Sequence, residues 1–181
     1  MSSRSNRRTT KSKIYKPVKY SAETYASECV LHNDGSTQGS NAYLKNPIVP
    51  MTNGILGTRK IKNITIKFLV EDCLYHHTAG DTKEKGMIAW ALVYVPEGTN
   101  PADFTWGSNA GIASFYEPSQ NVIMSGYATS DQPVVAKTRL ARNLNSGDTI
   151  GLIIMDMNYA VVAGEALDTA VSFMVNYAIC F

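Results

Sequence analysis

Large apolar residues occupy every second position at the C-terminal end of the chain. They are Val171, Phe173, Val175, Tyr177, Ile179 and Phe181, and smaller or more polar residues stand between them. Successive side chains of a β-strand point to opposite faces, so this period of two predicts a strand with one core-facing side. No window of twelve residues carries an apolar stripe at the helical spacing of three and four. We therefore expect an all-β protein.

Two runs indicate how other strands are buried. Met87–Val95 is apolar on both faces and stops at Pro96-Glu97-Gly98, which is typical of a central strand. Lys60–Val70 alternates between apolar and more polar residues and predicts a half-buried strand. In this second run the core side is expected to carry Ile64, Ile66, Phe68 and Val70, and the opposite side Asn63, Thr65, Lys67 and Leu69.

The remaining strands bring the predicted number to seven or eight. Clear runs are Asn121–Ala128, Val134–Arg142 and Thr149–Met157, and weaker runs are Ser27–His32 and Tyr159–Val162. The turn residues Asn145-Ser146-Gly147-Asp148 separate the last two clear runs, and Gly147 suits a positive φ. We therefore expect those two runs to form a hairpin.

The connections complete the predicted fold class. Single helical turns are expected near Asn100–Phe104 and Gly164–Ala170, and long loops at Asn33–Thr58 and Glu97–Gln120. Two antiparallel sheets packed face to face bury one-sided strands. Eight strands with long connections in about 160 residues favour an antiparallel eight-stranded jelly-roll sandwich over a tight meander. A body of this size buries enough surface to fold without disulfides or metals.

Charge divides the chain into two parts. The basic N-terminal arm, residues 1–22, has no acidic residue, whereas the predicted jelly-roll domain, residues 23–181, has 10 Lys and Arg against 15 Asp and Glu, a formal charge of −5. The polar composition of the first twelve residues cannot offset the entropy cost of ordering them, so we expect a disordered arm. Its seven cations are Arg4, Arg7, Arg8, Lys11, Lys13, Lys16 and Lys19.

Such an arm is typical of nucleic-acid binding, because it releases counterions from phosphates without needing a fixed fold. Nuclear import, an anionic membrane surface and a merely solubilising tail are the alternatives. No apolar run approaches the ~20 residues of a membrane-spanning helix, and no secretory signal is recognisable. We therefore expect a soluble intracellular protein without a membrane partner.

The residues that usually carry enzyme chemistry form no recognisable constellation. His32, His76 and His77 lack the spacing of a metal site or a catalytic triad, although nearby acids make a zinc or calcium site at 76–77 conceivable. On a strand, the two adjacent histidines would point to opposite faces. Cys29, Cys73 and Cys180 are too far apart for a zinc cluster and are expected as buried thiols. We predict no catalytic residues, no metal, no cofactor and no enzyme activity.

Four segments carry a resemblance to a known family. They are Gly57–Ile66, Ala91–Gly98, Tyr116–Gly126 and Arg139–Asp148, which together span most of the body. With a basic arm in front and a strand at the end, the chain resembles the single jelly-roll capsid proteins of the satellite tobacco necrosis virus type and their relatives in small circular single-stranded DNA viruses.

The resemblance implies a homo-oligomer of roughly 60 copies, the smallest icosahedral shell (T=1), with arms pointing inward onto a single-stranded genome. It favours DNA over RNA as that viral genome. It also implies a location in the virion, and in the host nucleus or cytoplasm during assembly. With seven charges each, the arms of roughly 60 copies carry too few cations to neutralise a genome of about a thousand nucleotides. Lys60, Lys62 and Lys67, or solution cations, are expected to supply the remaining positive charge.

Two other classes of protein fit parts of the pattern. A non-viral β-sandwich binding module with a nucleic-acid-binding basic tail has the same charge division and would stay small in solution. A hydrolase on a β scaffold would need a catalytic constellation that the sequence does not display.

Overall fold

The computed structural model describes residues 19–33, 42–49, 57–99, 107–109, 112–114, 121–158 and 165–180. Within these ranges the chain folds into antiparallel β-strands and has no helix, which confirms the all-β prediction. The strands are β1 (Ser21–Asn33), β2 (Ala42–Val49), β3 (Arg59–Val70), β4 (Cys73–His76), β5 (Thr82–Glu84), β6 (Met87–Val95), β7 (Gly107–Asn109), β8 (Ile112–Ser114), β9 (Asn121–Thr129), β10 (Val134–Thr138), β11 (Arg142–Leu144), β12 (Thr149–Asp156) and β13 (Ala166–Cys180).

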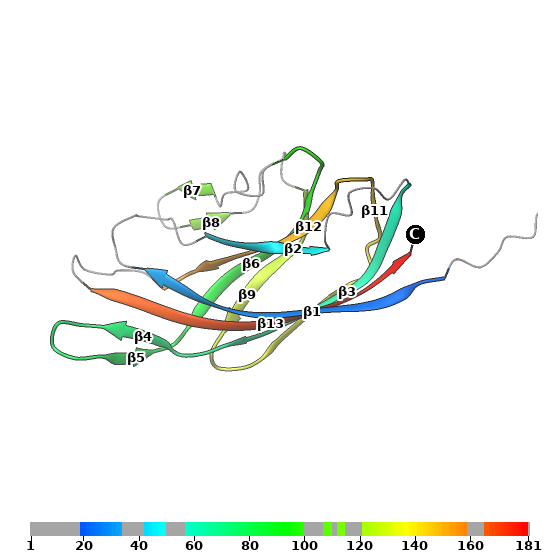
Figure 1. The fold of residues 1–181 in the computed structure, drawn as a ribbon. Coiled ribbons are helices and arrows are strands. Elements are labelled where there is room, and N and C mark those ends of the chain that lie inside the picture. The colour runs from blue at the N-terminus through cyan, green and yellow to red at the C-terminus, as the bar shows by residue number, and fades with distance from the viewer. Residues whose placement is uncertain are drawn as a thin grey trace, which may run out of the picture.

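The strands form two large sheets (Figure 1). Sheet A has the order β10-β3-β13-β4-β5, with β1 also paired to β13 and β11 also paired to β3. Sheet B has the order β2-β12-β6-β9, and β7 and β8 form a small separate pair. The long strand β13 is central to sheet A because β1 lies along one of its edges and β3 and β4 along the other.

An apolar layer joins the two sheets. Phe68 of β3 and Trp90 of β6 meet with ring centroids 5.1 Å apart, and Phe173 of β13 packs on Phe68 at 6.2 Å. Tyr25 of β1 in turn stacks on Phe173 at 6.2 Å. Trp90 belongs to sheet B and the other rings to sheet A, so these contacts hold the sheets face to face as a β-sandwich.

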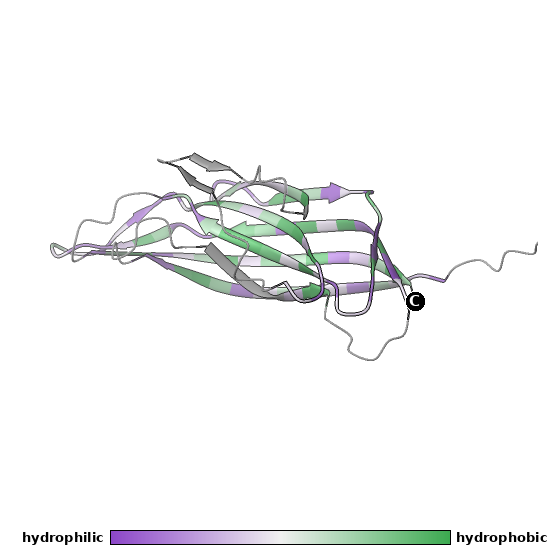
Figure 2. Cartoon of the chain, turned by 90° about the horizontal axis from the view of Figure 1, so that it is seen from above, coloured by the Kyte–Doolittle hydropathy of each residue, from purple (hydrophilic) through white to green (hydrophobic). Residues whose placement is uncertain are grey.

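Polar and apolar residues alternate along the strands, and the apolar residues face the core. Figure 2 shows hydrophilic positions recurring between hydrophobic positions along the strands. In β13, for example, every second residue from Leu167 to Ile179 is buried. Strand β6 differs because both of its faces are buried, and Ala89, Ala91 and Val93 form a second apolar cluster on the side away from sheet A. The prediction of a central strand at Met87–Val95 is therefore confirmed.

A buried polar contact links the sheets at one end. Thr169 of β13 donates a hydrogen bond to the Oδ2 atom of Asp156, the last residue of β12, at 2.7 Å. The two residues are 0% and 8% exposed. Burial raises the pKa of Asp156 above its ordinary value, although the Asn158 N–H and Thr169 hydroxyl oppose this rise.

Two predicted segments differ from the structure in their boundaries or type. The run at Ser27–His32 is part of the longer β1, which begins at Ser21. The helical turn predicted near Gly164–Ala170 is wrong, because residues 166–170 begin β13 and pair with β1 and β4. Their small and polar side chains hide the alternation that buries Leu167 and Thr169. The segments Asn100–Phe104 and Tyr159–Val162 lie outside the described residues.

The long loops predicted at Asn33–Thr58 and Glu97–Gln120 also contain strands. The first includes β2, an outer strand of sheet B, and the second includes β7 and β8. Strand β2 is difficult to recognise in the sequence because Pro47 interrupts its pattern, and proline is tolerated in a strand at a sheet edge.

The predicted hairpin of Val134–Arg142 with Thr149–Met157 is wrong. The first run divides into β10 and β11, which pair with β3 in sheet A, whereas β12 pairs with β2 and β6 in sheet B. The turn at 145–148 therefore carries the chain from one sheet to the other. Apolar alternation does not distinguish a hairpin within one sheet from a connection between two sheets, since both place the same side chains in the core.

Asp148 fixes this turn between the sheets. Its Oδ2 atom accepts hydrogen bonds from Tyr94 Oη at 2.6 Å and Asn145 N at 2.7 Å, and its Oδ1 atom accepts from Glu97 N at 3.0 Å. Arg59 of β3 donates to the Asp148 carbonyl at 2.8 Å. Burial alone would raise the pKa of Asp148, but these hydrogen bonds and the Arg59 charge together lower it.

The Asp148→Ala variant should lose about 3 kcal/mol of unfolding free energy, because three donors in a partly buried turn lose their acceptor. Urea denaturation of the variant and the parent protein measures this loss. Asp131→Ala is the matched control, since Asp131 forms only an exposed ion pair with Lys85 at 2.7 Å, and it should change stability by less than about 1 kcal/mol. Equal losses in the two variants would contradict a special role for Asp148.

Candidate nucleic-acid interface

Lysines gather on the outer face of sheet A, the face that points away from sheet B. Residues paired across neighbouring strands share a face. Lys67 of β3 pairs with Val135 of β10 and Met174 of β13, and Met174 pairs with Ala26 of β1. All four side chains are exposed, including 52% of Val135 and 39% of Met174. This row therefore lies on the solvent side of the sheet.

The neighbouring rows continue this surface toward the end of β13. Lys137 pairs with Thr65, which pairs with Asn176, and the Asn176 Oδ1 atom accepts a hydrogen bond from Thr24 at 2.8 Å. The following rows place Lys62 opposite Ala178 and Lys60 opposite Cys180. We call Lys60, Lys62, Lys67 and Lys137 the cationic half of the outer face.

The four lysines keep an unneutralised charge. The four rows that carry the lysines, those of Met174, Asn176, Ala178 and Cys180, contain no acidic residue, whereas Glu23 pairs with Tyr177 in the row between the second and the third. Among the described residues, none of the four ammonium groups forms an ion pair, and Lys60, Lys67 and Lys137 are exposed. Such a surface attracts phosphates, because cations without carboxylate partners can replace the counterions of a nucleic acid.

A β-bulge at Asn63 determines that the lysines of β3 share one face. Strand β13 advances from Asn176 to Ala178 while β3 advances from Thr65 to Lys62, so β3 has one extra residue. Asn63 adopts the left-handed conformation with φ 54°, which asparagine tolerates better than most residues. The extra residue reverses the alternation, so Lys60 and Lys62 point outward like Lys67, and Ile61 is buried.

The alternation predicted for residues 63–70 is confirmed, and the bulge reverses the alternation only at residues 60–62. It also explains why the predicted strand Val134–Arg142 is interrupted. Thr138 pairs with Ile64 and Arg142 pairs with Ile61, so the residues between them lie opposite the bulge and leave the ladder. The sequence alone does not identify Lys137 as part of this surface, because its place beside the other lysines follows from the pairing of β10 with β3.

The basic arm joins the body at the cationic half. The Lys62 ammonium lies 3.7 Å from the centre of the Tyr20 ring, and β1 begins one residue later. Burial and a hydrogen bond with Cys180 raise the pKa of Tyr20. Lys19 precedes this contact and is exposed. Of the seven arm residues predicted to bind nucleic acid, the other six lie outside the described residues: Arg4, Arg7, Arg8, Lys11, Lys13 and Lys16.

The opposite end of sheet A carries histidines paired with carboxylates. Asp168 of β13 contacts His32 Nδ1 at 2.6 Å through Oδ1 and His76 Nε2 at 3.3 Å through Oδ2. The other ring nitrogen of His76 lies 3.1 Å from Asp81. Hydrogen bonds with Asp81 and Asp168 raise the pKa of His76. The charge of the outer face therefore differs between its two ends.

His77 follows the end of β4 and has a different partner from His76. Its Nδ1 atom lies 3.0 Å from Glu165, and its ring stacks on Tyr75 at 3.9 Å. Tyr75 also donates a hydrogen bond to Glu165 at 2.8 Å.

In the described part of the chain, no group of three His, Cys, Asp or Glu residues could hold a metal ion. None of the three cysteines forms a disulfide, and Cys73 and Cys180 are buried whereas Cys29 is half-buried.

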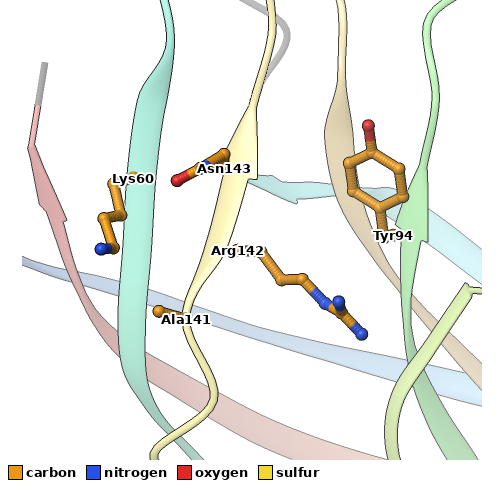
Figure 3. Close-up of a pocket in the computed structure, with 5 residues that line it drawn as sticks. All are labelled: Lys60, Tyr94, Ala141, Arg142 and Asn143. Atoms are coloured by element: carbon orange, nitrogen blue, oxygen red, sulfur yellow. The ribbon is translucent and has the colours of Figure 1, made fainter.

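A pocket of about 400 Å³ adjoins the cationic half. Its lining residues are Lys60, Tyr94, Ala141, Arg142 and Asn143 (Figure 3). Arg142 extends from β11 toward the strand that carries Tyr94, whereas Asn143 extends toward Lys60. Burial and the hydrogen bond to Asp148 raise the pKa of Tyr94 to about 12, although the Arg142 charge opposes this rise. The pocket thus combines two cations with an amide and a neutral phenol.

No known protein-family model and no curated protein matches this chain. Across the residues that the structure describes, no helix has the length and apolar character needed to span a membrane.

The bulge can be tested by substitution. Asn63→Val should reduce the unfolding free energy by about 1–2 kcal/mol, because a β-branched residue strongly disfavours the left-handed conformation. Asn63→Gly should change it by less than about 1 kcal/mol. Thr65→Val, in the regular part of the same strand, is the matched control and should be nearly neutral in urea denaturation. A neutral Asn63→Val variant would argue against the bulge.

His76 should titrate above the ordinary histidine pKa of 6.5, because only the charged ring donates hydrogen bonds from both nitrogens. Its stabilising contribution is therefore complete below pH 6.5 and disappears as the pH rises through the raised pKa. An NMR titration of the His76 ring measures the midpoint. Asp81→Asn should lower the midpoint, and Asp131→Asn should not change it. A midpoint at or below 6.5 in the parent protein would disprove this assignment.

Proposed function

We propose that this chain is a structural capsid protein that self-assembles into a small icosahedral shell and packages single-stranded nucleic acid. The observation that carries the proposal is the position of the cationic half. It lies on the outer face of sheet A at the point where the basic arm joins the body. A polyanion bound to the arm would therefore also have access to the lysines of the sheet.

The finer fold within this proposal is an eight-stranded jelly roll preceded by an arm whose composition predicts disorder, and the strand pairing supports the jelly roll. The eight main strands in chain order are β1, β2, β3, β6, β9, β10, β12 and β13. The first pairs with the eighth, the second with the seventh, the third with the sixth, and the fourth with the fifth. This is the pairing expected when one long antiparallel ribbon is wound into two sheets.

The charge balance favours a polymer as the partner. The seven arm cations precede β1 in the sequence, the four sheet lysines lie on one half of the outer face, and the rest of the chain has a net negative charge. Many copies side by side would line a shell with these cations, and roughly 60 copies form the smallest closed icosahedral shell. We propose single-stranded DNA as the favoured genome, and the virion, with the host nucleus or cytoplasm during assembly, as the location. The proposed role requires no catalysis, cofactor or membrane.

Particle mass tests assembly. Analytical ultracentrifugation of the purified full chain should show a species of about 1.2 MDa, which is 60 copies of the 19.8 kDa chain. Negative-stain electron microscopy should show closed shells, with an absorbance ratio at 260 and 280 nm that reports packaged nucleic acid. A protein that stays monomeric or trimeric at every concentration and ionic strength would instead support the binding-module alternative.

Salt dependence tests the cationic surface. Each neutralised phosphate of a single strand contributes about −0.7 to the slope of log K against log salt. Deleting residues 1–19 should leave a folded body that no longer retains nucleic acid. The double variant Lys67→Gln/Lys137→Gln should make the slope for an oligothymidylate less negative by about 1.4. Lys83→Gln/Lys85→Gln removes the same charge elsewhere and is the matched control. An unchanged slope in the first double variant, or unchanged packaging after the deletion, would contradict the proposal.

A further inference from the structure

The side chains that line the pocket beside β11 are suited to binding an anion. Lys60 and Arg142 both line it, and neither has an ion-pair partner among the described residues. Asn143 adds an amide that can donate or accept hydrogen bonds. The volume of about 400 Å³ lies within the range of small-molecule sites, roughly 300–1,000 Å³.

The aromatic wall of the pocket is held in place from behind. The Tyr94 hydroxyl donates to Asp148 at 2.6 Å, and the Asp148 carboxylate also accepts hydrogen bonds from two backbone N–H groups. Asp148 is 3% exposed, so its charge is satisfied within the turn and the pocket itself presents cations. A fixed aromatic ring next to a guanidinium offers a base a surface to stack on and a phosphate a partner to bind.

The place of the pocket in the fold makes it accessible to an extended chain. Among the described strands, β11 pairs with β3 alone, so its other edge borders the pocket without a neighbouring strand. Arg142 and Asn143 project to opposite sides of β11 (Figure 3), as successive strand residues do. Lys60 belongs to both the pocket and the cationic half. A nucleic acid that runs along the outer face of sheet A past Lys60 would therefore reach the unpaired edge of β11, which borders the pocket.

We propose that this pocket binds one nucleotide of a single-stranded nucleic acid, with a phosphate on Arg142, the base against the Tyr94 ring, and Lys60 and Asn143 on the adjoining backbone. This inference rests on the proposed function and deepens it, because it assigns a defined contact to a surface that otherwise acts by charge alone. The geometry favours a nucleotide over inorganic phosphate, since phosphate would leave the aromatic wall unused.

Photocrosslinking tests the site on the full-length protein after bound nucleic acid has been removed at high salt. A short oligothymidylate with a 5-iodouracil base should crosslink to Tyr94, as located by mass spectrometry. Arg142→Gln should reduce this crosslink about tenfold, equivalent to roughly 1.4 kcal/mol. Arg139→Gln removes the same charge from an exposed position outside the pocket and should reduce it by less than about twofold. Equal reductions in both variants, or no crosslink to Tyr94, would overturn the proposal.

Competition distinguishes the two sources of phosphate. Thymidine monophosphate should suppress the Tyr94 crosslink at concentrations where inorganic phosphate does not. Equal suppression by both would identify a general anion site and overturn the nucleotide assignment. Shells that package nucleic acid without the Tyr94 crosslink would refute this inference alone, whereas a chain that neither assembles nor retains nucleic acid would refute the proposed function.

Discussion

The apolar layer between the two sheets is the constraint on which the other features depend. Phe68, Trp90 and Phe173 fill this layer, so the strands of sheet A must turn one set of side chains inward and leave the other set in water. The outer face is therefore available for charged residues without any loss of core packing. At its two ends the layer is closed by polar contacts, from Thr169 to Asp156 and from Arg59 to the Asp148 carbonyl.

Strand identity could be predicted from the sequence where burial alone decides it. Strand β6 has the bounds that its two-sided apolar run predicts, and the alternation at the C-terminal end lies in β13. Register could not be predicted in the same way. The bulge at Asn63 depends on the pairing with β13, and β11 and β12 are placed in different sheets by partners that are distant in sequence. Strand β2 was missed because Pro47 interrupts its pattern.

In the candidate site, likewise, the sequence reveals which residues are cations but not how they are arranged. The concentration of cations in the arm is visible directly in the sequence, as are Lys60, Lys62 and Lys67. That these three lysines share a face, and that Lys137 joins them, follows only from the bulge and the neighbouring ladder. The pocket brings Tyr94 of sheet B close to Arg142 of sheet A, two residues that are far apart in the chain. A contact between residues of two different sheets depends on the tertiary fold and cannot be predicted from the periodicity of the sequence.

The two buried carboxylates that close the sandwich respond to acid in opposite directions. Asp148 has a lowered pKa, so its contribution is complete above the ordinary value of 3.8 and is lost only as the pH falls through the lower folded-state pKa. Asp156 has a raised pKa, so its ionisation costs stability as the pH rises above 3.8, and protonation relieves that cost. Lowering the pH through the raised pKa of Asp156 therefore removes a destabilising charge at one end of the sandwich, while the Asp148 carboxylate at the other end stays ionised.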